Sequence, residues 1–347
     1  MESIRLNVPL LRKRVKNLTS AARSAGLRPA TVSNLCTGKI PVERAEVRTI
    51  VALASLANCS LDELILRGET VKMIETKIKT IDLFAPIVKG GTIGLVARPG
   101  MGQLVVLAEL LYRLKQDGYK TVLLKPQEKH PDLSIIMEDV DAVVGSIDQA
   151  YAEISKLSEN HDIIFTADRS HILTGELYDL QQQLDTSHQN SVTTFLLDLK
   201  GESVDESLPY GPLDTLWQFD ADLAARHLYP AINPNQSTSS ILEGAGLDEN
   251  HFLLQHKAQK LLRRYRELRS IVNVNGVKGI PSSEIEAYTK GERLEAYLTQ
   301  PFYVAESLTG QKGQSVKLED TLKDVQRIID GDVNSKEVSS LTFIGNL

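Results

Sequence analysis

The sequence predicts a multidomain protein in which a small all-α domain precedes an α/β domain with a largely parallel sheet. Its 347 residues are enough for two ordinary domains. Residues 10–66 read as short helices with tight turns, and no run among them alternates as a strand does. After a linker at residues 67–73, strand-like runs alternate with helical ones, as in parallel α/β sheets.

The composition is that of a globular chain, with 42% hydrophobic and 24% charged residues. No window approaches a membrane span, and the charged N-terminus does not resemble a secretory signal. We therefore expect a cytoplasmic protein with no membrane partner. Cys36 and Cys59 are too few for a disulfide framework and have no histidines at zinc-finger spacing, so we expect core thiols.

The charge is divided unevenly along the chain. Residues 1–70 hold 11 Lys and Arg against 6 Asp and Glu, a balance of +5, whereas the rest holds 28 against 39, a balance of −11. A basic head on an acidic body indicates that the head meets an anionic partner.

The basic head divides into short helices. The first is expected over residues 9–16, and Thr19 then caps a second helix that closes at Gly26. The segment RPATVSNLCTGK places Pro29 at the first helical position and Gly38 at the end, with apolar residues at helical spacing between them. Two further helices are expected over residues 42–57 and 61–66.

The second and third of these helices carry a small residue, a turn glycine, a Ser-polar pair and a terminal glycine: Ala22, Gly26, Ser33, Asn34 and Gly38. This pattern resembles the helix-turn-helix domain of the phage-repressor and XRE type. The resemblance implies a DNA-binding domain over residues 1–68, with its third helix in the major groove of double-stranded DNA.

The outward residues of the third helix are the candidate base readers. Asn34 can pair bidentately with adenine, Thr31 offers a methyl and a hydroxyl group, and Arg28 can reach guanine or a phosphate. The predicted base readers are Arg28, Ala30, Thr31 and Asn34, and the predicted backbone contacts are Arg12, Lys13 and Lys39. The alternative is that these are solvated charges on a helical domain that docks on proteins.

A glycine loop follows the first strand of the body. A phosphate-binding loop has the pattern GxxxxGK[ST], in which Lys reaches the β and γ phosphates and the hydroxyl holds magnesium. Residues Ala97 to Leu104 read ARPGMGQL, so Gly100 and Gly102 remain while Gln103 replaces the Lys and Leu104 the hydroxyl. Neither replacement supplies a positive charge or a metal ligand, so Mg-ATP hydrolysis is not expected.

Longer motifs in the body resemble the catalytic beta subunit of the rotary ATP synthase. IKTIDLFAPIVKGGTIGL matches that family almost residue for residue, YPAINPNQSTSSIL resembles its YPAVDPLDSTSR region, and the run from His256 to LTQPFYVAESLTG aligns without gaps. The likeness covers residues 74–347. It implies a P-loop NTPase-like, RecA-like domain over residues 74–240 and a helical domain over residues 241–347.

The resemblance also assigns candidate site residues. Glu128 keeps the carboxylate that orients attacking water, and Lys129 replaces a phosphate-binding arginine. The magnesium-supporting aspartate of the family falls near Ala167 or Asp168. Tyr229 and Phe302 match the adenine-side aromatics, and Leu308 replaces another. The alternatives are that Tyr229 and Phe302 now fill the old pocket as core residues, and that Glu128 is a solvated loop residue. A nucleotide or another small ligand remains an open expectation, and no resident cofactor is predicted.

These observations predict a DNA-binding transcriptional regulator with a catalytically inactive, ATP synthase beta-like body. The body is expected to self-associate through its ATP synthase-like surfaces, as a ring or a hetero-oligomer, and to sense a ligand. The acidic loop through which the family's rotor is pushed corresponds to Lys278–Glu284, KGIPSSE, whose acidic cluster is lost. No catalytic metal is expected, because the seven histidines are scattered. Two alternatives remain: a DNA-linked ATPase that uses Lys129 or a neighbour's cation, and an adaptor that docks on synthase subunits.

Overall fold

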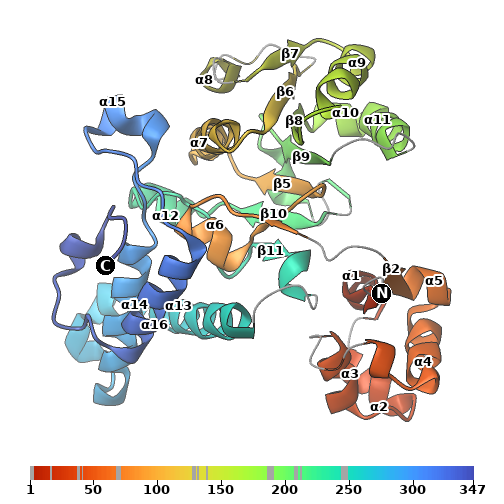
Figure 1. Cartoon of the computed structure of the whole chain (residues 1–347). Helices are drawn as coiled ribbons and strands as arrows, with labels where there is room; N and C mark the ends of the chain where they lie inside the picture. Colours follow the sequence, from red (N-terminus) through yellow and green to blue (C-terminus); the bar gives the residue numbers. More distant parts are fainter. Residues whose placement is uncertain are drawn as a thin grey trace. The chain divides into compact units, whose positions relative to one another are not determined.

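The computed structural model describes residues 4–15, 18–36, 40, 42–67, 72–126, 130, 133–137, 140–185, 191–206, 210–211, 213–243 and 249–347. The chain divides into two compact units (Figure 1). The first unit comprises Met1–Met73 with Ser239–Phe252, and the second comprises Ile74–Thr238 with Leu253–Leu347. The three-domain bounds inferred from the sequence stay a prediction.

The first unit is mainly helical. Its helices are α1 (Val8–Arg14), α2 (Leu18–Ser24), α3 (Pro29–Cys36), α4 (Val47–Ala57) and α5 (Leu61–Leu64), with a 3-10 turn at Val42–Arg44. The prediction of an all-helical head is wrong, because strand β1 (Ile4–Leu6) pairs antiparallel with β2 (Ile65–Arg67). Runs of three residues are too short to display the alternation of a strand, and the partners lie at opposite ends of the head.

Side-chain capping explains two of the helix starts in the first unit, those of α1 and α5. The Asn7 side chain accepts a hydrogen bond from the Leu10 amide at 3.2 Å, and Ser60 forms a capping box with Glu63. Some expected helix bounds are wrong, including that of the helix over residues 61–66, which ends at Leu64 because Ile65 and Leu66 belong to β2. Thr19 lies inside α2 rather than capping it, and the helix expected over residues 42–57 is interrupted where Glu46 adopts an extended conformation with ψ 132°.

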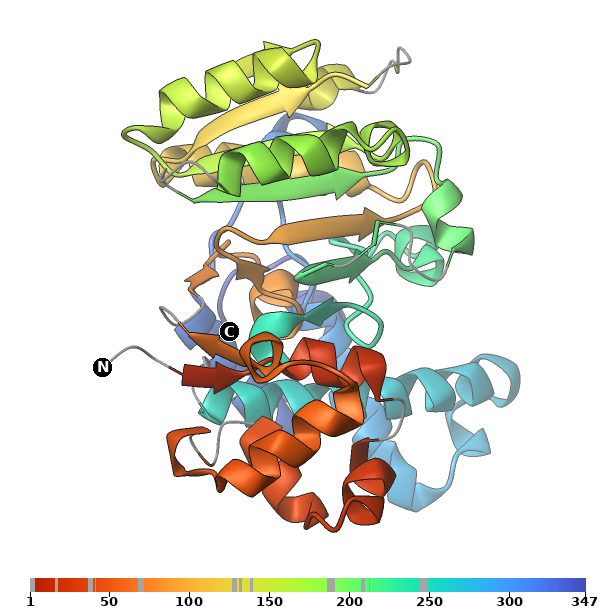
Figure 2. The ribbon, with the colours of Figure 1, turned by 90° about the vertical axis from the view of Figure 1, so that its right-hand side faces the viewer.

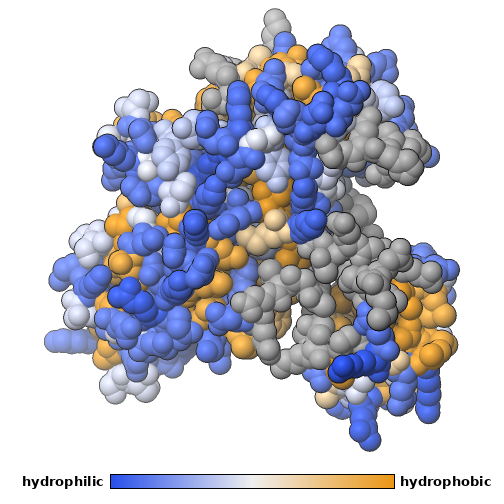
Figure 3. All heavy atoms as spheres, viewed as in Figure 1, coloured by the Kyte–Doolittle hydropathy of each residue, from blue (hydrophilic) through white to orange (hydrophobic). Residues whose placement is uncertain are grey.

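The core of the first unit follows the predicted spacing. Val32, Leu35 and Cys36 of α3 are buried among side chains of α1, α4 and α5, and Cys59 packs against this core. One apolar surface is left exposed. Val47 and Val51 on α4 are 76% and 44% exposed, and orange atoms are visible over this part of the unit in Figure 3.

The second unit is built on a seven-stranded sheet with the strand order β11-β10-β5-β9-β8-β6-β7. Its strands are β5 (Thr92–Val96), β6 (Lys120–Leu124), β7 (Ala142–Val144), β8 (Ile163–Asp168), β9 (Val192–Leu197), β10 (Thr215–Gln218) and β11 (Thr238–Ser239). Every neighbouring pair from β10 to β7 is parallel, which confirms the predicted α/β sheet.

Helices cover both faces of this sheet. In Figure 1, α7 (Gln103–Gln116) and α8 (Ser134–Met137) lie on one face, while α9 (Ile147–Ser158), α10 (Ser170–Leu173) and α11 (Glu176–Asp185) lie on the other. Figure 2 shows α9 and α11 lying roughly along the direction of the strands. Alternate strand residues serve the two cores: Leu95 packs with the α7 side and Val96 with the α9 side. Such double burial explains why the strands read as continuous apolar runs.

The remaining elements form a helical body beside the sheet. They are β3 (Met73–Ile74), α6 (Lys79–Phe84), β4 (Ile87–Val88), α12 (Ala221–Ala225), α13 (Glu249–Asn275), α14 (Ile285–Tyr297), α15 (Glu306–Thr309) and α16 (Leu318–Asp330). Leu83 and Phe84 of α6 are buried among side chains of α13, α14 and α16. No helix within the described residues is both long and apolar enough to cross a bilayer.

A buried lysine ties α6 to the C-terminal segment. The Lys79 side chain is fully buried, and its Nζ donates hydrogen bonds to the carbonyl oxygens of Tyr297 and, at 2.9 Å, Ile344. The same nitrogen lies 4.1 Å from the centre of the Tyr297 ring. Burial lowers the pKa of Lys79 from 10.5 to about 7, and the nearby Asp324 carboxylate acts in the opposite direction.

Lys79 should make the stability of the second unit depend on pH in the alkaline range. Its pKa is lower in the folded chain, so the unfolded chain binds more protons between pH 7 and 10.5, and the free energy of unfolding rises with pH across that window. In Lys79→Met this slope should become flatter, as measured by urea unfolding at several pH values. Burial raises the pKa of Asp82 only to about 7, so its titration lies below the window. Equal slopes in the two proteins would contradict this account.

Candidate functional site

A cavity of about 590 Å³ lies in the second unit at the carboxyl end of β5. Ligands of open α/β sheets bind at this edge, where loops leave the strands. The cavity is bounded by the glycine loop, the first turn of α7, the loop after β9, Tyr229 and the segment around α15. Its lining residues are Pro99, Gly100, Gly102, Gln103, Leu104, Val105, Val106, His130, Ile135, Leu199, His227, Tyr229, Gln300, Pro301, Phe302, Ala305, Leu308, Thr309, Gln311 and Phe343.

The glycine loop has the backbone conformation that its glycines permit. Gly100 and Gly102 have φ values of +86° and +87°, in the left-handed region that other residues rarely adopt. Gly102 also faces a close neighbour, because a Cβ there would lie 3.1 Å from Cε1 of Tyr229. Ala97, at the start of the loop, is buried in the sheet core. Both glycines are therefore required by the backbone conformation of this loop.

The two replaced residues are both buried. Gln103 is 7% exposed and lines the cavity, while its side-chain amide has no hydrogen-bond partner among the described residues. Leu104 is 8% exposed and belongs to the core between α7 and the sheet. A neutral amide and a core leucine stand where a triphosphate would need a cation and a metal-binding hydroxyl.

The carboxylates at the carboxyl edge of the sheet are engaged by backbone amides. Asp168 accepts hydrogen bonds from Ser170 N at 3.0 Å and Leu199 N at 3.2 Å. Asp198 accepts from Lys200 N at 3.0 Å and Ser203 N at 2.6 Å. Each aspartate therefore fastens a loop, and in the described part of the chain no three His, Cys, Asp or Glu side chains gather as metal ligands would. Glu128 and Lys129 lie outside the described residues.

The structure brings the predicted aromatic pocket and the glycine loop together. Tyr229, Phe302 and Leu308 all line the cavity. They differ in burial, since Phe302 is 5% exposed, Tyr229 is half-buried and Leu308 is 89% exposed. Phe302 belongs to the core below the cavity, whereas most of the Leu308 side chain faces solvent, so Leu308 contributes only a small part of the wall.

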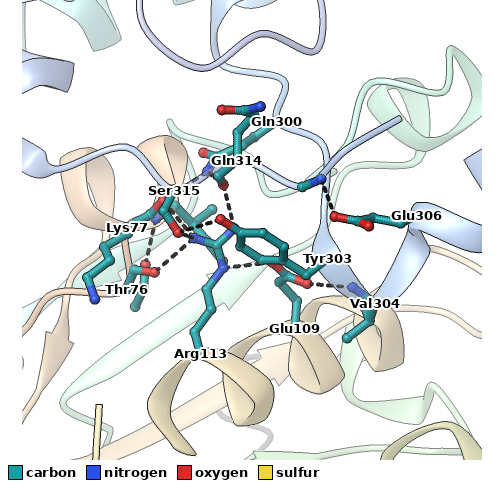
Figure 4. Close-up of polar contacts among 12 residues, drawn as sticks. Thr76, Lys77, Glu109, Arg113, Gln300, Tyr303, Val304, Glu306, Gln314 and Ser315 are labelled. Carbon is teal, nitrogen blue, oxygen red and sulfur yellow. Dashed lines mark hydrogen bonds and ion pairs between the residues drawn. The ribbon is translucent and has the colours of Figure 1, made fainter. Parts of the chain in front are cut away.

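A buried ion pair on α7 holds the other side of the site in place (Figure 4). Arg113 Nε lies 2.7 Å from Glu109 Oε1, and the two side chains are 3% and 0% exposed. Arg113 also donates to Lys77 O at 3.0 Å, Ser315 Oγ at 2.9 Å and Gln314 O at 2.7 Å, and Glu109 accepts from Val304 N at 3.0 Å. The pair thus fixes the chain on both sides of α15 against α7. Sequence reasoning missed it, because a Glu and an Arg four residues apart usually mark an exposed helix face.

The first unit contains the second candidate site, the outward face of α3. Arg28 and Ala30 are exposed, and Thr31 and Asn34 are half-buried. The turn before α3 uses Gly26 at φ +74°. Arg12 and Lys13 belong to α1, but their side chains lie outside the described residues, as does Lys39 entirely. The structure therefore places all four predicted base readers at one helix and its start.

Comparisons with known proteins identify the fold of this chain. No family model matches the sequence. The structure of a unique ATP synthase subunit, NeqB from Nanoarcheaum equitans, is similar to this one with a TM-score of 0.58 and 14% sequence identity. The match covers 76% of this chain and 77% of that one. At this level of identity the likeness concerns the fold alone, and the chain has an ATP synthase subunit-like fold with a mostly parallel α/β sheet.

Proposed function

We propose that this protein is a sequence-specific DNA-binding transcriptional regulator whose α/β body does not hydrolyse ATP and serves self-association and ligand sensing. One observation carries the DNA-binding part: α3 buries Val32 and Leu35 in a basic head, while Arg28 just before the helix is exposed and Thr31 and Asn34 are partly exposed. A helix with an apolar inner face and these outer side chains has the donors, acceptors and methyl groups that read base edges in the major groove.

The chemistry of the cavity supports the inactive body. Gln103 has no charge to offset that of a triphosphate, Leu104 is part of the core, and Asp168 is occupied by two backbone amides. Phosphoryl transfer depends on cations placed around the transferred group, so these residues do not supply its main stabilisation. Self-association would use the surfaces of the ATP synthase subunit-like fold, as a ring or a hetero-oligomer, and several heads on one assembly would bind repeated half-sites with avidity.

Duplex binding by the full chain should depend steeply on salt. A labelled duplex of random sequence, followed by fluorescence anisotropy, should bind at low salt and dissociate as salt rises, because the cations of the head replace counterions on phosphates. Replacing Arg12 and Lys13 together by Ala should weaken this binding and reduce the salt slope by about two. No binding at low salt, or binding indifferent to salt, would remove DNA as the partner of the head.

ATP turnover should be absent. Purified protein with magnesium and ATP is expected to release no phosphate above the buffer rate, because the loop lacks its Lys and its hydroxyl. The measurement compares the wild-type chain with Glu128→Gln. Magnesium-dependent turnover that disappears in Glu128→Gln would overturn the inactive body and favour the DNA-linked ATPase. Co-purification with an alpha-like synthase subunit and no duplex binding would favour the adaptor.

A further inference from the structure

We propose that the cavity beside α7 binds an uncharged, largely apolar small molecule that carries one amide-like group, in place of a nucleoside triphosphate. This inference names the ligand class for the ligand-sensing part of the proposed function and rests on that part alone. The cavity volume, the charge of its lining and the hydrogen bonding of two glutamines carry it.

The size and the walls of the cavity suit a small organic molecule. Ligand pockets commonly enclose about 300–1,000 Å³ and are lined mainly by apolar side chains with a few polar groups. This cavity encloses about 590 Å³. Its apolar walls come from α7, α8, the loop after β9 and the segment before α15, and they include Leu104, Val105, Val106, Ile135, Leu199 and Phe302.

In the described lining the ionisable side chains are those of His130, His227 and Tyr229, and no permanently charged group faces an ionic ligand. None of the side chains that line the cavity in the described part of the chain is Lys, Arg, Asp or Glu. An ion entering such a space loses its hydration without gaining a counter-ion, which is strongly unfavourable. The N-terminus of α7 contributes a partial positive charge, which favours anions. An anion of the same shape as the proposed ligand is therefore the strictest comparison for testing the ligand class.

Gln103 supplies the polar anchor. Its side chain is 7% exposed and lines the cavity, yet its amide has no hydrogen-bond partner among the described residues. Because it lines the cavity, this amide can offer both a donor and an acceptor to a molecule bound there. A ligand amide can satisfy both at once. Tyr229 lines the same cavity.

Gln300 shows what a structural glutamine looks like at the same cavity. Its Oε1 accepts from Lys79 N at 2.9 Å, and its Nε2 donates to Lys77 O at 2.9 Å and Gln314 O at 2.6 Å. That amide is saturated by the backbone and has a structural role. The contrast singles out Gln103 as the amide left for a ligand.

Three probes of the same shape test the ligand class on the full chain. Naphthalene carboxamide, naphthalene carboxylate and naphthylmethylammonium are titrated separately and followed by calorimetry and ligand-observed NMR. The carboxamide should bind at least about tenfold more tightly than either ion, because only the ions must be desolvated as charges. Equal or tighter binding of either ion, or no saturable binding of any probe, would overturn the proposal.

Variants of Gln103 locate the binding. Gln103→Leu should weaken carboxamide binding by about five- to tenfold, the effect of one hydrogen-bonding anchor, whereas Gln116→Leu at the exposed far end of α7 should leave it unchanged. Gln103→Lys should reverse the preference toward the carboxylate. Unchanged carboxamide binding in Gln103→Leu would contradict the assignment of the anchor. No DNA is present in these titrations, so their failure would leave the DNA-binding proposal standing.

Discussion

Replacing Arg113 with Met is expected to lower the free energy of unfolding of the second unit by about 3–5 kcal/mol, as is usual when one partner of a buried ion pair is removed. The variant leaves the Glu109 carboxylate in a fully buried position with no cation beside it. It also removes the hydrogen bonds that join α7 to Lys77, Gln314 and Ser315. The methylene stem of Met fills part of the space, so the loss is mainly electrostatic.

The single tryptophan of the chain makes this prediction measurable in the unit concerned. Trp217 lies in β10, is fully buried and donates from Nε1 to Ala85 O at 2.9 Å, so its fluorescence reports unfolding of the second unit. Urea unfolding followed at Trp217 should show a much lower midpoint for Arg113→Met. The matched control is Arg264→Met, because Arg264 forms exposed ion pairs with Glu267 and Glu284 and should matter little.

A second substitution separates the charge from the lost contacts. In Glu109→Leu/Arg113→Met the unpaired carboxylate is gone, so part of the stability should return. A midpoint for Arg113→Met as close to wild type as that of Arg264→Met would show that the buried pair does not hold the segment around α15 in place.

The second large effect is expected on DNA recognition. Asn34→Ala should reduce affinity for a selected duplex by about 1–3 kcal/mol, equivalent to roughly 5- to 150-fold, because a bidentate contact to adenine would be lost. Asn34 is a half-buried residue of α3 and is not one of the apolar side chains that form the core of the unit. Affinity for unrelated duplexes should change little, so the ratio of specific to non-specific binding should fall.

The measurement is anisotropy of the selected and an unrelated duplex against the full chain at one salt concentration. Ser55→Ala is the matched control, because Ser55 is an exposed small polar residue on α4 of the same unit. Arg28→Ala should resemble Asn34→Ala if Arg28 reads a base. It should instead weaken both duplexes equally if Arg28 contacts a phosphate. An unchanged specificity ratio in Asn34→Ala would exclude α3 as the reading helix.

The α/β sheet could be predicted because the pattern of apolar residues within each short segment indicates whether that segment is a strand or a helix. Strands such as Ile163–Asp168 and Val192–Leu197 are rich in apolar and β-branched residues, and the long helix after the glycine loop is amphipathic, so the type of each element and their order along the chain follow from the sequence. The turn before α3 and its buried face could be predicted in the same way, from a glycine and from apolar residues at helical spacing. Val32, Leu35 and Cys36 are buried where that spacing placed them.

Features that depend on distant partners were not predictable. The pairing of Ile4–Leu6 with Ile65–Arg67 joins the two ends of the head, and the sequence of neither three-residue strand predicts it. The burial of Lys79 and Arg113 also depends on distant segments, because carbonyl groups from the C-terminal third of the chain accept hydrogen bonds from both side chains. The assignment of Ser239–Phe252 to the first unit likewise depends on tertiary packing, which the spacing of apolar residues along the sequence does not predict.

The candidate site divides in the same way. The loss of loop chemistry at Gln103 and Leu104 follows from residue identity alone, and the cavity brings both together with Tyr229 and Phe302. The difference between the partnerless amide of Gln103 and the saturated amide of Gln300 required coordinates. The exposure of Leu308, which replaces an aromatic residue of the resembling family, also depends on how α15 is held.

Selection of random duplex DNA by the full-length protein, repeated at several salt concentrations, tests the regulator hypothesis most directly. The account predicts an enriched motif with repeated half-sites. Selection by Asn34→Ala and by Arg28→Ala should lose it, and binding should weaken as salt screens the phosphate contacts. The number and spacing of the half-sites would then indicate how many DNA-binding heads one oligomer presents. Enrichment of no motif, or salt-sensitive binding without sequence preference, would contradict sequence-specific regulation and leave the head as a docking domain.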